Sequence, residues 1–192
     1  MEIVFATNNE NKIIEVKSLF PKSIKILSLS EIGCYEEIHE SGKTLKENAQ
    51  IKVDYIRNKY SIDCFADDSG LEVKSLNGSP GVLSARFAGI PKNDNNNIKK
   101  LLNLLKDKKN TEAQFRTLIA IRINSLNQSF EGTLEGSISL KIKGTNGFGY
   151  DPIFIPKGYN KTLGELSSSI KNTISHRAIA TLKLLYFLKN MK

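Results

Sequence analysis

Cysteine is scarce in this sequence, and the two that are present, Cys34 and Cys64, stand in no metal-binding spacing. That scarcity fits a reducing cytosol, in which both would be ordinary buried thiols rather than parts of a disulfide framework. Long apolar runs are also lacking, since none approaches the ~20 residues that a membrane span needs. Residues 1–6 carry no basic segment and are too short for a signal peptide, so we interpret them as a first strand. We therefore expect a cytoplasmic protein with no membrane partner.

Internal repeats, low-complexity tracts and linkers are missing as well, so we expect a single domain over residues 1–192. The hydrophobic content of 40% is enough for a core and excludes a disordered chain. The net charge of +8 is compatible with a polyanionic partner, either nucleic acid or a phosphorylated small molecule. The densest basic patch, within residues 99–109, has no interleaved aromatics, which indicates a solvated helix face rather than a single-strand binder.

The most informative stretch is Phe65–Val73, in which two acids, a hydroxyl and a glycine separate two apolar runs. Residues 62–66 predict a buried strand entering this stretch, and the alternation of Leu71 with Val73 predicts a strand leaving it. Paired acids at a strand end are costly to bury unless a metal ion or lysines meet them. The alternative is a solvated acidic turn, and these four residues alone do not decide between the two interpretations.

Two polar segments precede helices. The loop over residues 7–12 leads into a helix that runs to about Phe20. The free N–H groups at the start of this helix suit an anion. In the alternative interpretation, Asn8 or Asn9 is an ordinary helix cap. The loop is not a P-loop, because it lacks the glycines and the Lys-Ser/Thr pair. A second helix, predicted from Thr44 to about Tyr60 by a capping box, carries Lys52 on a face that either reaches a cleft or stays at the surface.

The second half of the chain predicts further sheet and one unusual loop. We expect a polar loop over residues 93–97, a helix over 97–106, and long antiparallel strands over 115–124 and 129–143. The loop over residues 144–152 holds three glycines and two aromatics. Such a loop either stacks on a planar ring or plugs the core, and we weigh the two equally.

A last helix is expected after Ser175, with His176 and Arg177 in its first turn. A cation beside the positive end of a helix dipole is unfavourable, so this placement indicates contact with a phosphate or an acid. The buried face of this helix is predicted to consist of Ala178, Leu182, Leu185 and Tyr186.

Taken in order, these segments resemble the inosine triphosphate pyrophosphatase family, whose members hydrolyse non-standard purine nucleoside triphosphates. The resemblance implies an α/β fold with a long mixed central sheet flanked by helices, two lobes around a cleft, and a homodimer. It also implies Mg²⁺ and the release of pyrophosphate to give the monophosphate. The matching stretches are residues 6–12 with Glu15, 40–42 with Thr44, 47–49 with Lys52, 66–73, 77–81 with 84–86, 147–152 and 175–177.

The resemblance also implies a role for each matching residue. Glu40 and Asp68 would hold Mg²⁺, and Asp68 would act as the general base. Ile170 and Ala178 depart from the acid and the glycine that are usual in the family, and both lie near the implied base pocket. The implied substrate-binding residues are Thr7, Asn8, Asn9, Glu10, Asn11, Lys12 and Lys52 for the triphosphate, Ser69, and Phe148, Gly149, Tyr150, Asp151, Lys171, His176 and Arg177 for the base and sugar.

Two other functions compete with this one. A Maf-type pyrophosphatase would act on other nucleotides, but the segments 148–152 and 175–177 argue against it. A basic nucleic-acid-binding module would bind DNA or RNA in a salt-sensitive way without Mg²⁺-dependent turnover. We expect no specific nucleic-acid partner.

Overall fold

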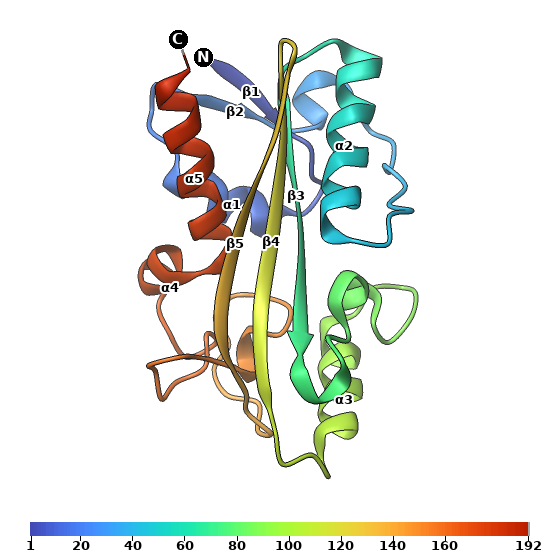
Figure 1. The fold of residues 1–192 in the computed structure, drawn as a ribbon, viewed down its shortest axis with the longest axis vertical. Coiled ribbons are helices and arrows are strands. Elements are labelled where there is room, and N and C mark those ends of the chain that lie inside the picture. Colours follow the sequence, from blue (N-terminus) through green and yellow to red (C-terminus); the bar gives the residue numbers. More distant parts are fainter. Residues whose placement is uncertain (192) are drawn as a thin grey trace. The chain divides into compact units, whose positions relative to one another are not determined.

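The computed structural model describes residues 1–191 and confirms the expected α/β fold with a mixed sheet (Figure 1). Its six strands lie in the order β2-β1-β3-β4-β5-β6, with β1 parallel to β2 and β3, and β5 antiparallel to β6. Within residues 1–191, no helix has the length and apolar character to cross a membrane. The elements are β1 (Glu2–Phe5), α1 (Glu10–Leu19), β2 (Lys25–Leu27), α2 (Leu45–Tyr60), β3 (Cys64–Val73), α3 (Asp94–Leu105), β4 (Glu112–Ile123), β5 (Leu126–Ile138), β6 (Phe154–Pro156), α4 (Ser168–Ile174) and α5 (His176–Asn190).

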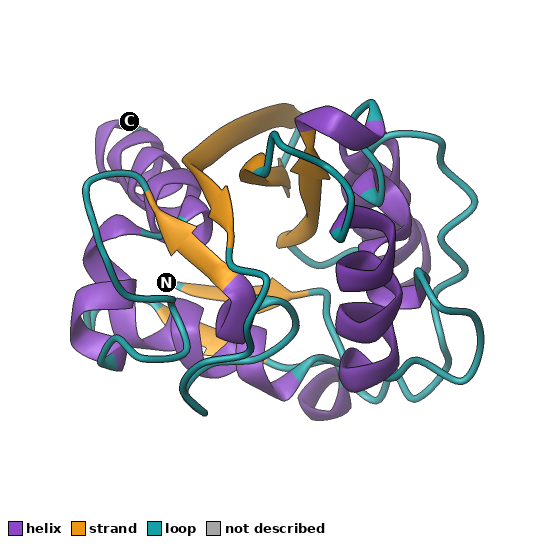
Figure 2. Ribbon diagram, turned by 90° about the horizontal axis from the view of Figure 1, so that it is seen from below, coloured by secondary structure: helices purple, strands orange, loops and turns teal. Residues whose placement is uncertain are grey.

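The described chain forms two compact units, and β3, β4 and β5 each run through both of them. Unit 1 contains β1, β2, α1, α2 and nearly all of α5, whereas unit 2 contains α3, β6 and α4. Figure 2 distinguishes the helices (purple) from the strands (orange). The single domain expected over residues 1–192 stays a prediction. Unit 1 comprises residues 1–68, 117–132 and 177–191, and unit 2 comprises residues 69–116 and 133–176.

The core of unit 1 is built on β1 and β3. The rings of Phe5 and Phe65 stack with their centroids 4.5 Å apart, and both side chains are fully buried. The capping box predicted for α2 is present, because Thr44 accepts from the Glu47 N–H at 3.1 Å while the Glu47 carboxylate accepts from Thr44. The chain thus enters α2 at a fixed residue, which determines which of its side chains face β3.

The core of unit 2 gathers around Phe154 of β6, which packs on Phe115 of β4. Here two predicted boundaries were wrong. The segment 93–97 is not a loop, because Asn93 caps α3 by accepting from the Asn96 N–H and the helix begins at Asp94. The turn between β4 and β5 lies at residues 124–125 rather than 125–128, since Asn124 adopts a positive φ of 50° there.

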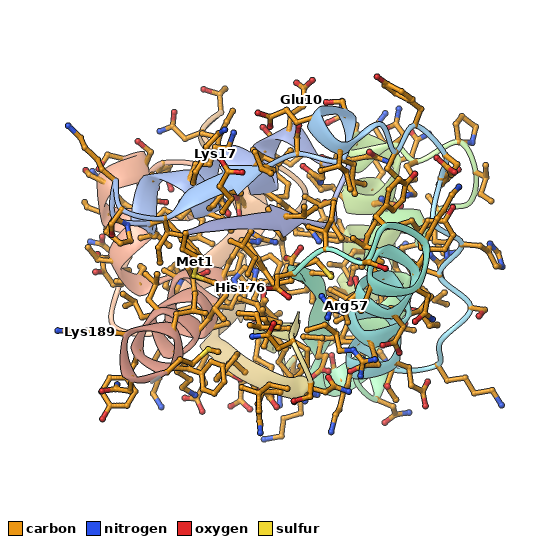
Figure 3. All side chains as sticks on the ribbon, turned by 90° about the horizontal axis from the view of Figure 1, so that it is seen from above. Met1, Glu10, Lys17, Arg57, His176 and Lys189 are labelled. Carbon is orange, nitrogen blue, oxygen red and sulfur yellow. The ribbon has the colours of Figure 1, made fainter. Side chains whose placement is uncertain are left out.

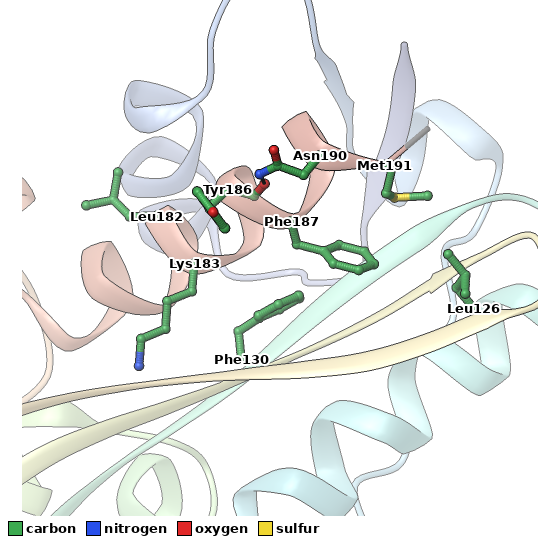
Figure 4. A pocket seen from close by; sticks show the side chains of 8 residues that line it. All are labelled: Leu126, Phe130, Leu182, Lys183, Tyr186, Phe187, Asn190 and Met191. Carbon is green, nitrogen blue, oxygen red and sulfur yellow. Dashed lines mark hydrogen bonds between the residues drawn. The ribbon is translucent and has the colours of Figure 1, made fainter.

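The predicted buried face of α5 was right for Ala178, which is buried, whereas Leu185 is half-buried and the other two positions were wrong. Leu182 and Tyr186 are 53% and 75% exposed, whereas Ala180, Leu184 and Leu188 are buried. The helix is apolar on several faces, so periodicity alone could not choose among them. Figure 4 shows the resulting packing from one side, where Phe187 of α5 lies over Phe130 of β5 with ring centroids 5.4 Å apart.

Candidate functional site

Two adjacent acids, Asp67 and Asp68, lie within β3, not in a turn. The strand continues without interruption from Cys64 to Val73, and the two side chains are 0% and 8% exposed. The solvated acidic turn is therefore wrong. Gly70 lets the strand pass close to neighbouring backbone, because a Cβ at this position would lie 2.4 Å from the Gly81 carbonyl oxygen.

Asp67 is surrounded by cations from three helices. Its Oδ1 lies 2.9 Å from Lys12 Nζ of α1, and its Oδ2 accepts from Arg177 Nε of α5 at 3.0 Å. Its backbone carbonyl accepts from Lys52 Nζ of α2 at 2.6 Å. Burial alone would raise the pKa of Asp67, but the charges of Lys12, Arg177 and Lys52 outweigh it and hold that pKa well below its usual range. These cations thus favour the ionised form of Asp67.

Asp68 lies in a different environment. Its Oδ2 accepts from Asn48 Nδ2 of α2 at 3.0 Å, and burial raises its pKa, helped by the charge of Glu40 and opposed by Lys52 and Lys12. Glu40, partly exposed, accepts from Lys52 Nζ at 2.7 Å. Each of the two carboxylates expected to hold a metal therefore binds a side chain of α2, Glu40 binding Lys52 and Asp68 binding Asn48. Lys52 is 6% exposed, so the surface alternative for it is wrong.

The loop before α1 is an ordered cap. Asn9 Oδ1 accepts from the Lys12 N–H at 3.2 Å, and Thr7 Oγ1 accepts from the Asn9 N–H at 3.2 Å. Thr7 is buried and Lys12 is half-buried, whereas the side chains of Asn8 to Asn11 are exposed. The cap and the anion site are compatible, because Asn9 satisfies one N–H and the exposed polar residues line the helix N-terminus.

The first turn of α5 holds the acid contact that the sequence indicated for Arg177. The guanidinium binds Asp67 and also the Glu15 carboxylate of α1, with Arg177 Nη1 2.5 Å from Glu15 Oε2. Arg177 is 2% exposed, and the two acids raise its pKa although burial opposes this. The side chain is therefore fully engaged within unit 1.

The loop over residues 147–151, in unit 2, buries one of its two aromatics in the core, as one of the two interpretations expected, and stacking on a planar ring stays a prediction. Tyr150 plugs the core: it is 4% exposed and its hydroxyl donates to the Ser84 carbonyl at 2.9 Å. Phe148 is instead half-buried, and the Lys171 ammonium lies 4.7 Å from its ring centroid. Lys171 also pairs with the buried Asp151 carboxylate, which accepts from the Phe148 N–H at 2.9 Å.

Two further side chains of unit 2 bear on predicted site residues, and the sequence gave no signal for either. Asp94, at the start of α3, accepts from the Gly149 N–H at 2.8 Å and so holds the loop from outside. Phe115 stacks on His176, with centroids 4.6 Å apart and planes 10° apart. His176, labelled in Figure 3, is 4% exposed, and Ser69 is half-buried. The Asp94–Gly149 and Phe115–His176 contacts each join segments that are distant in sequence, so no local sequence pattern predicts them.

Known proteins resemble the chain along its full length. The sequence profile of the Ham1 family matches residues 3–187. The dITP/XTP pyrophosphatase of Flavobacterium psychrophilum is 53% identical over 190 residues, which cover 99% of this chain and 100% of that protein. The dITP/XTP pyrophosphatase of Bacillus subtilis is 45% identical over 187 residues, which cover 95% of this chain and 94% of that protein. The solved structure of the Staphylococcus aureus Ham1 protein matches with a TM-score of 0.91 at 41% identity, covering all of both chains.

Proposed function

The chain belongs to the Ham1 family, and on that premise we propose that it hydrolyses non-standard purine nucleoside triphosphates to the monophosphate and pyrophosphate. Because relatives 53% identical to it are named dITP/XTP pyrophosphatase, the substrates to test first are ITP, dITP and XTP. The observation that carries the proposal is the gathering of Lys12 and Lys52 around Asp67, beside the carboxylates of Asp68 and Glu40.

The cations would bind the triphosphate, which brings about four negative charges. Lys12 and Lys52 supply two ammonium groups, and the N-terminus of α1 adds its N–H groups and the positive end of its dipole. Buried or half-buried cations attract phosphate more strongly than solvated ones, because little water screens them. We assign residues 7–12 and Lys52 to the phosphates, and Ser69 to substrate contact.

We propose that Glu40 and Asp68 would hold a divalent cation, Mg²⁺. Burial and the charge of Glu40 both disfavour ionised Asp68, so a cation beside the two carboxylates would relieve an unfavourable arrangement. Within residues 1–191 no three His, Cys, Asp or Glu side chains gather as a metal site, so phosphate oxygens and water would complete the octahedron that Mg²⁺ prefers. When bound, Mg²⁺ would neutralise part of the charge on the triphosphate.

Asp68 is the residue we propose as general base. Attack on the α-phosphorus requires a water molecule in line with the leaving pyrophosphate, and a carboxylate within hydrogen-bond reach to take its proton. Asn48 holds one oxygen of Asp68 at 3.0 Å, which restricts rotation of the carboxylate. Asp67 is fully buried and bound to Lys12 and Arg177, so it is not the base.

The base and sugar would be framed by residues 148–151, Lys171, His176 and Arg177. Inosine and xanthosine carry O6 where adenine has an amino group, so a hydrogen-bond donor aimed at this atom would reject adenine. Arg177 is already bound to Asp67 and Glu15. We therefore favour the segment 148–151 as the source of the donor, with Phe148 and Lys171 presenting a ring and a cation side by side.

Pyrophosphate release from a nucleotide panel tests the proposal. We expect turnover of ITP, dITP and XTP with Mg²⁺, little turnover of ATP and GTP, and loss of turnover on chelation. Turnover of pyrimidine or modified nucleotides in preference to ITP would favour the Maf-type alternative. Salt-sensitive binding of DNA without any nucleotide turnover would favour the nucleic-acid module. The homodimer and the cytoplasmic location stay predictions.

A further inference from the structure

Asp67 is the best-connected acid of unit 1, yet the sequence gives it no role. Its carboxylate and backbone carbonyl bind three cations from three separate helices, Lys12 of α1, Lys52 of α2 and Arg177 of α5. The side chain is fully buried and lies on the central strand of unit 1. Asp67 is therefore the common partner that brings these three cations together.

The cations need this acid in order to lie together. Lys12 is repelled by the charges of Lys52 and Arg177, and Asp67, in direct contact with its ammonium at 2.9 Å, opposes that repulsion more than Asp68 does. Like charges in a poorly hydrated site repel more strongly than in bulk water, because the effective dielectric constant there is lower. Without a negative charge at position 67, the flexible Lys12 side chain would turn toward solvent, since its helix start is exposed.

We propose that Asp67 is a positioning residue for the reaction described under the proposed function, on which this inference rests: its carboxylate holds the Lys12 ammonium where the triphosphate binds. Arg177, bound to Glu15 on its other side, fixes the second oxygen of the carboxylate and so its orientation. Asp67 touches no substrate, because it is fully buried. Its effect on catalysis passes through Lys12.

The test is a double-mutant cycle with Asp67→Asn and Lys12→Ala. We expect Asp67→Asn to raise KM for ITP about tenfold or more, the scale of a lost hydrogen bond between charged groups, with a smaller change in kcat. Because both substitutions remove one positioned ammonium, the double variant should differ from Lys12→Ala in kcat/KM by no more than about twofold. Binding of inorganic tripolyphosphate, measured by calorimetry, should weaken in parallel.

A matched control separates positioning from stability. Asp63, just before β3, binds Arg57 at 2.9 Å and the Asn124 N–H at 3.0 Å, so Asp63→Asn also removes a charged pair from unit 1. It should lower the urea midpoint without changing KM. If Asp67→Asn does not fold, Asp67→Glu tests the positioning role instead. Glutamate keeps the negative charge, but its additional methylene group displaces the Lys12 ammonium, so KM for ITP should still rise.

The outcomes are distinguishable. A wild-type protein that turns over ITP, with KM unchanged in folded Asp67→Asn or Asp67→Glu, would overturn the positioning role alone. Effects of Asp67→Asn and Lys12→Ala that multiply in kcat/KM would also overturn it, because each residue would then act separately. A wild-type protein without turnover of any nucleotide would overturn the proposed function and this inference with it.

Discussion

Neighbouring side chains on a strand point to opposite faces, and this separates the surroundings of Asp67 and Asp68. Asp67 meets Lys12 of α1 and Arg177 of α5, and their charges lower its pKa. Asp68 meets Asn48 of α2, and burial raises its pKa. Two identical side chains one residue apart are thus suited to different tasks, one to organising cations and the other to contact with substrate and metal.

Replacement of Asp68 by Asn tests the proposed role of Asp68 as the general base. Asp68→Asn keeps the shape of the side chain and removes the proton acceptor, so we expect a folded protein whose kcat for ITP falls at least about 100-fold, the low end for loss of a general base. The measurement is steady-state pyrophosphate release, with circular dichroism and a urea titration to verify folding. A near-normal kcat would remove Asp68 from the role.

Cys64 provides a prediction about pH that is independent of the site. Burial raises the pKa of its thiol to about 12, and the thiol donates to the Val53 carbonyl at 3.4 Å. Unfolded cysteine ionises near pH 8.5, so as the pH rises above that value the unfolded state loses the proton first. The free energy of unfolding contributed by this group is therefore complete below about pH 8.5 and falls as the pH rises toward 12.

Cys64→Ala removes that dependence. Between pH 8 and 10.5 we expect the wild-type free energy of unfolding to fall by about 2.6 kcal/mol more than that of the variant, at 1.36 kcal/mol per unit of pKa shift. Urea titrations of both proteins at the two pH values measure it. Parallel losses in the two proteins would show that the Cys64 thiol ionises at its ordinary pKa in the folded state.

The elements differ in how far their sequences determine them. The start of α2 was predictable, because the Thr44–Glu47 capping box is local and is present as expected. The strand β3 was not, because four polar or small residues in succession favour a turn unless distant cations meet the acids. The face of α5 was not predictable either, since Leu182 and Leu184 are equally apolar and only packing leaves the first exposed and the second buried.

The contact between α3 and the loop 147–151 gives a prediction at this scale. Asp94 accepts from the Gly149 N–H at 2.8 Å and holds the loop that we assign to the base. Asp94→Ala removes the acceptor, so KM for ITP should rise about 2- to 10-fold, the range for one hydrogen bond, with kcat little changed. Asp94→Asn is the matched control, because it retains one acceptor oxygen, and its KM should rise less. Equal KM values in both variants and the wild type would exclude a role for this contact.

At the scale of the whole molecule, composition alone left the choice between nucleic acid and a phosphorylated small molecule open. The order of short segments favoured the small molecule, and some of those segments make contacts with residues far away in sequence. Lys12 and Arg177 both bind Asp67, although 165 positions separate Lys12 from Arg177. Such a cluster cannot be derived from residue spacing, because its members meet only after the sheet has formed.

The net charge of +8 predicts how the protein meets its substrate. A positively charged surface attracts a nucleoside triphosphate from a distance, and salt screens that attraction beyond about 10 Å at 0.1 M. With Mg²⁺ held constant, kcat/KM for ITP should therefore fall about tenfold between 20 mM and 500 mM KCl, whereas kcat at saturating ITP should change little, because Lys52 and Asp67 are buried away from the screening ions. Steady-state kinetics across this series measures both quantities. A constant kcat/KM would show that the overall charge does not steer the substrate, and a parallel fall of kcat would place the salt effect on the site itself.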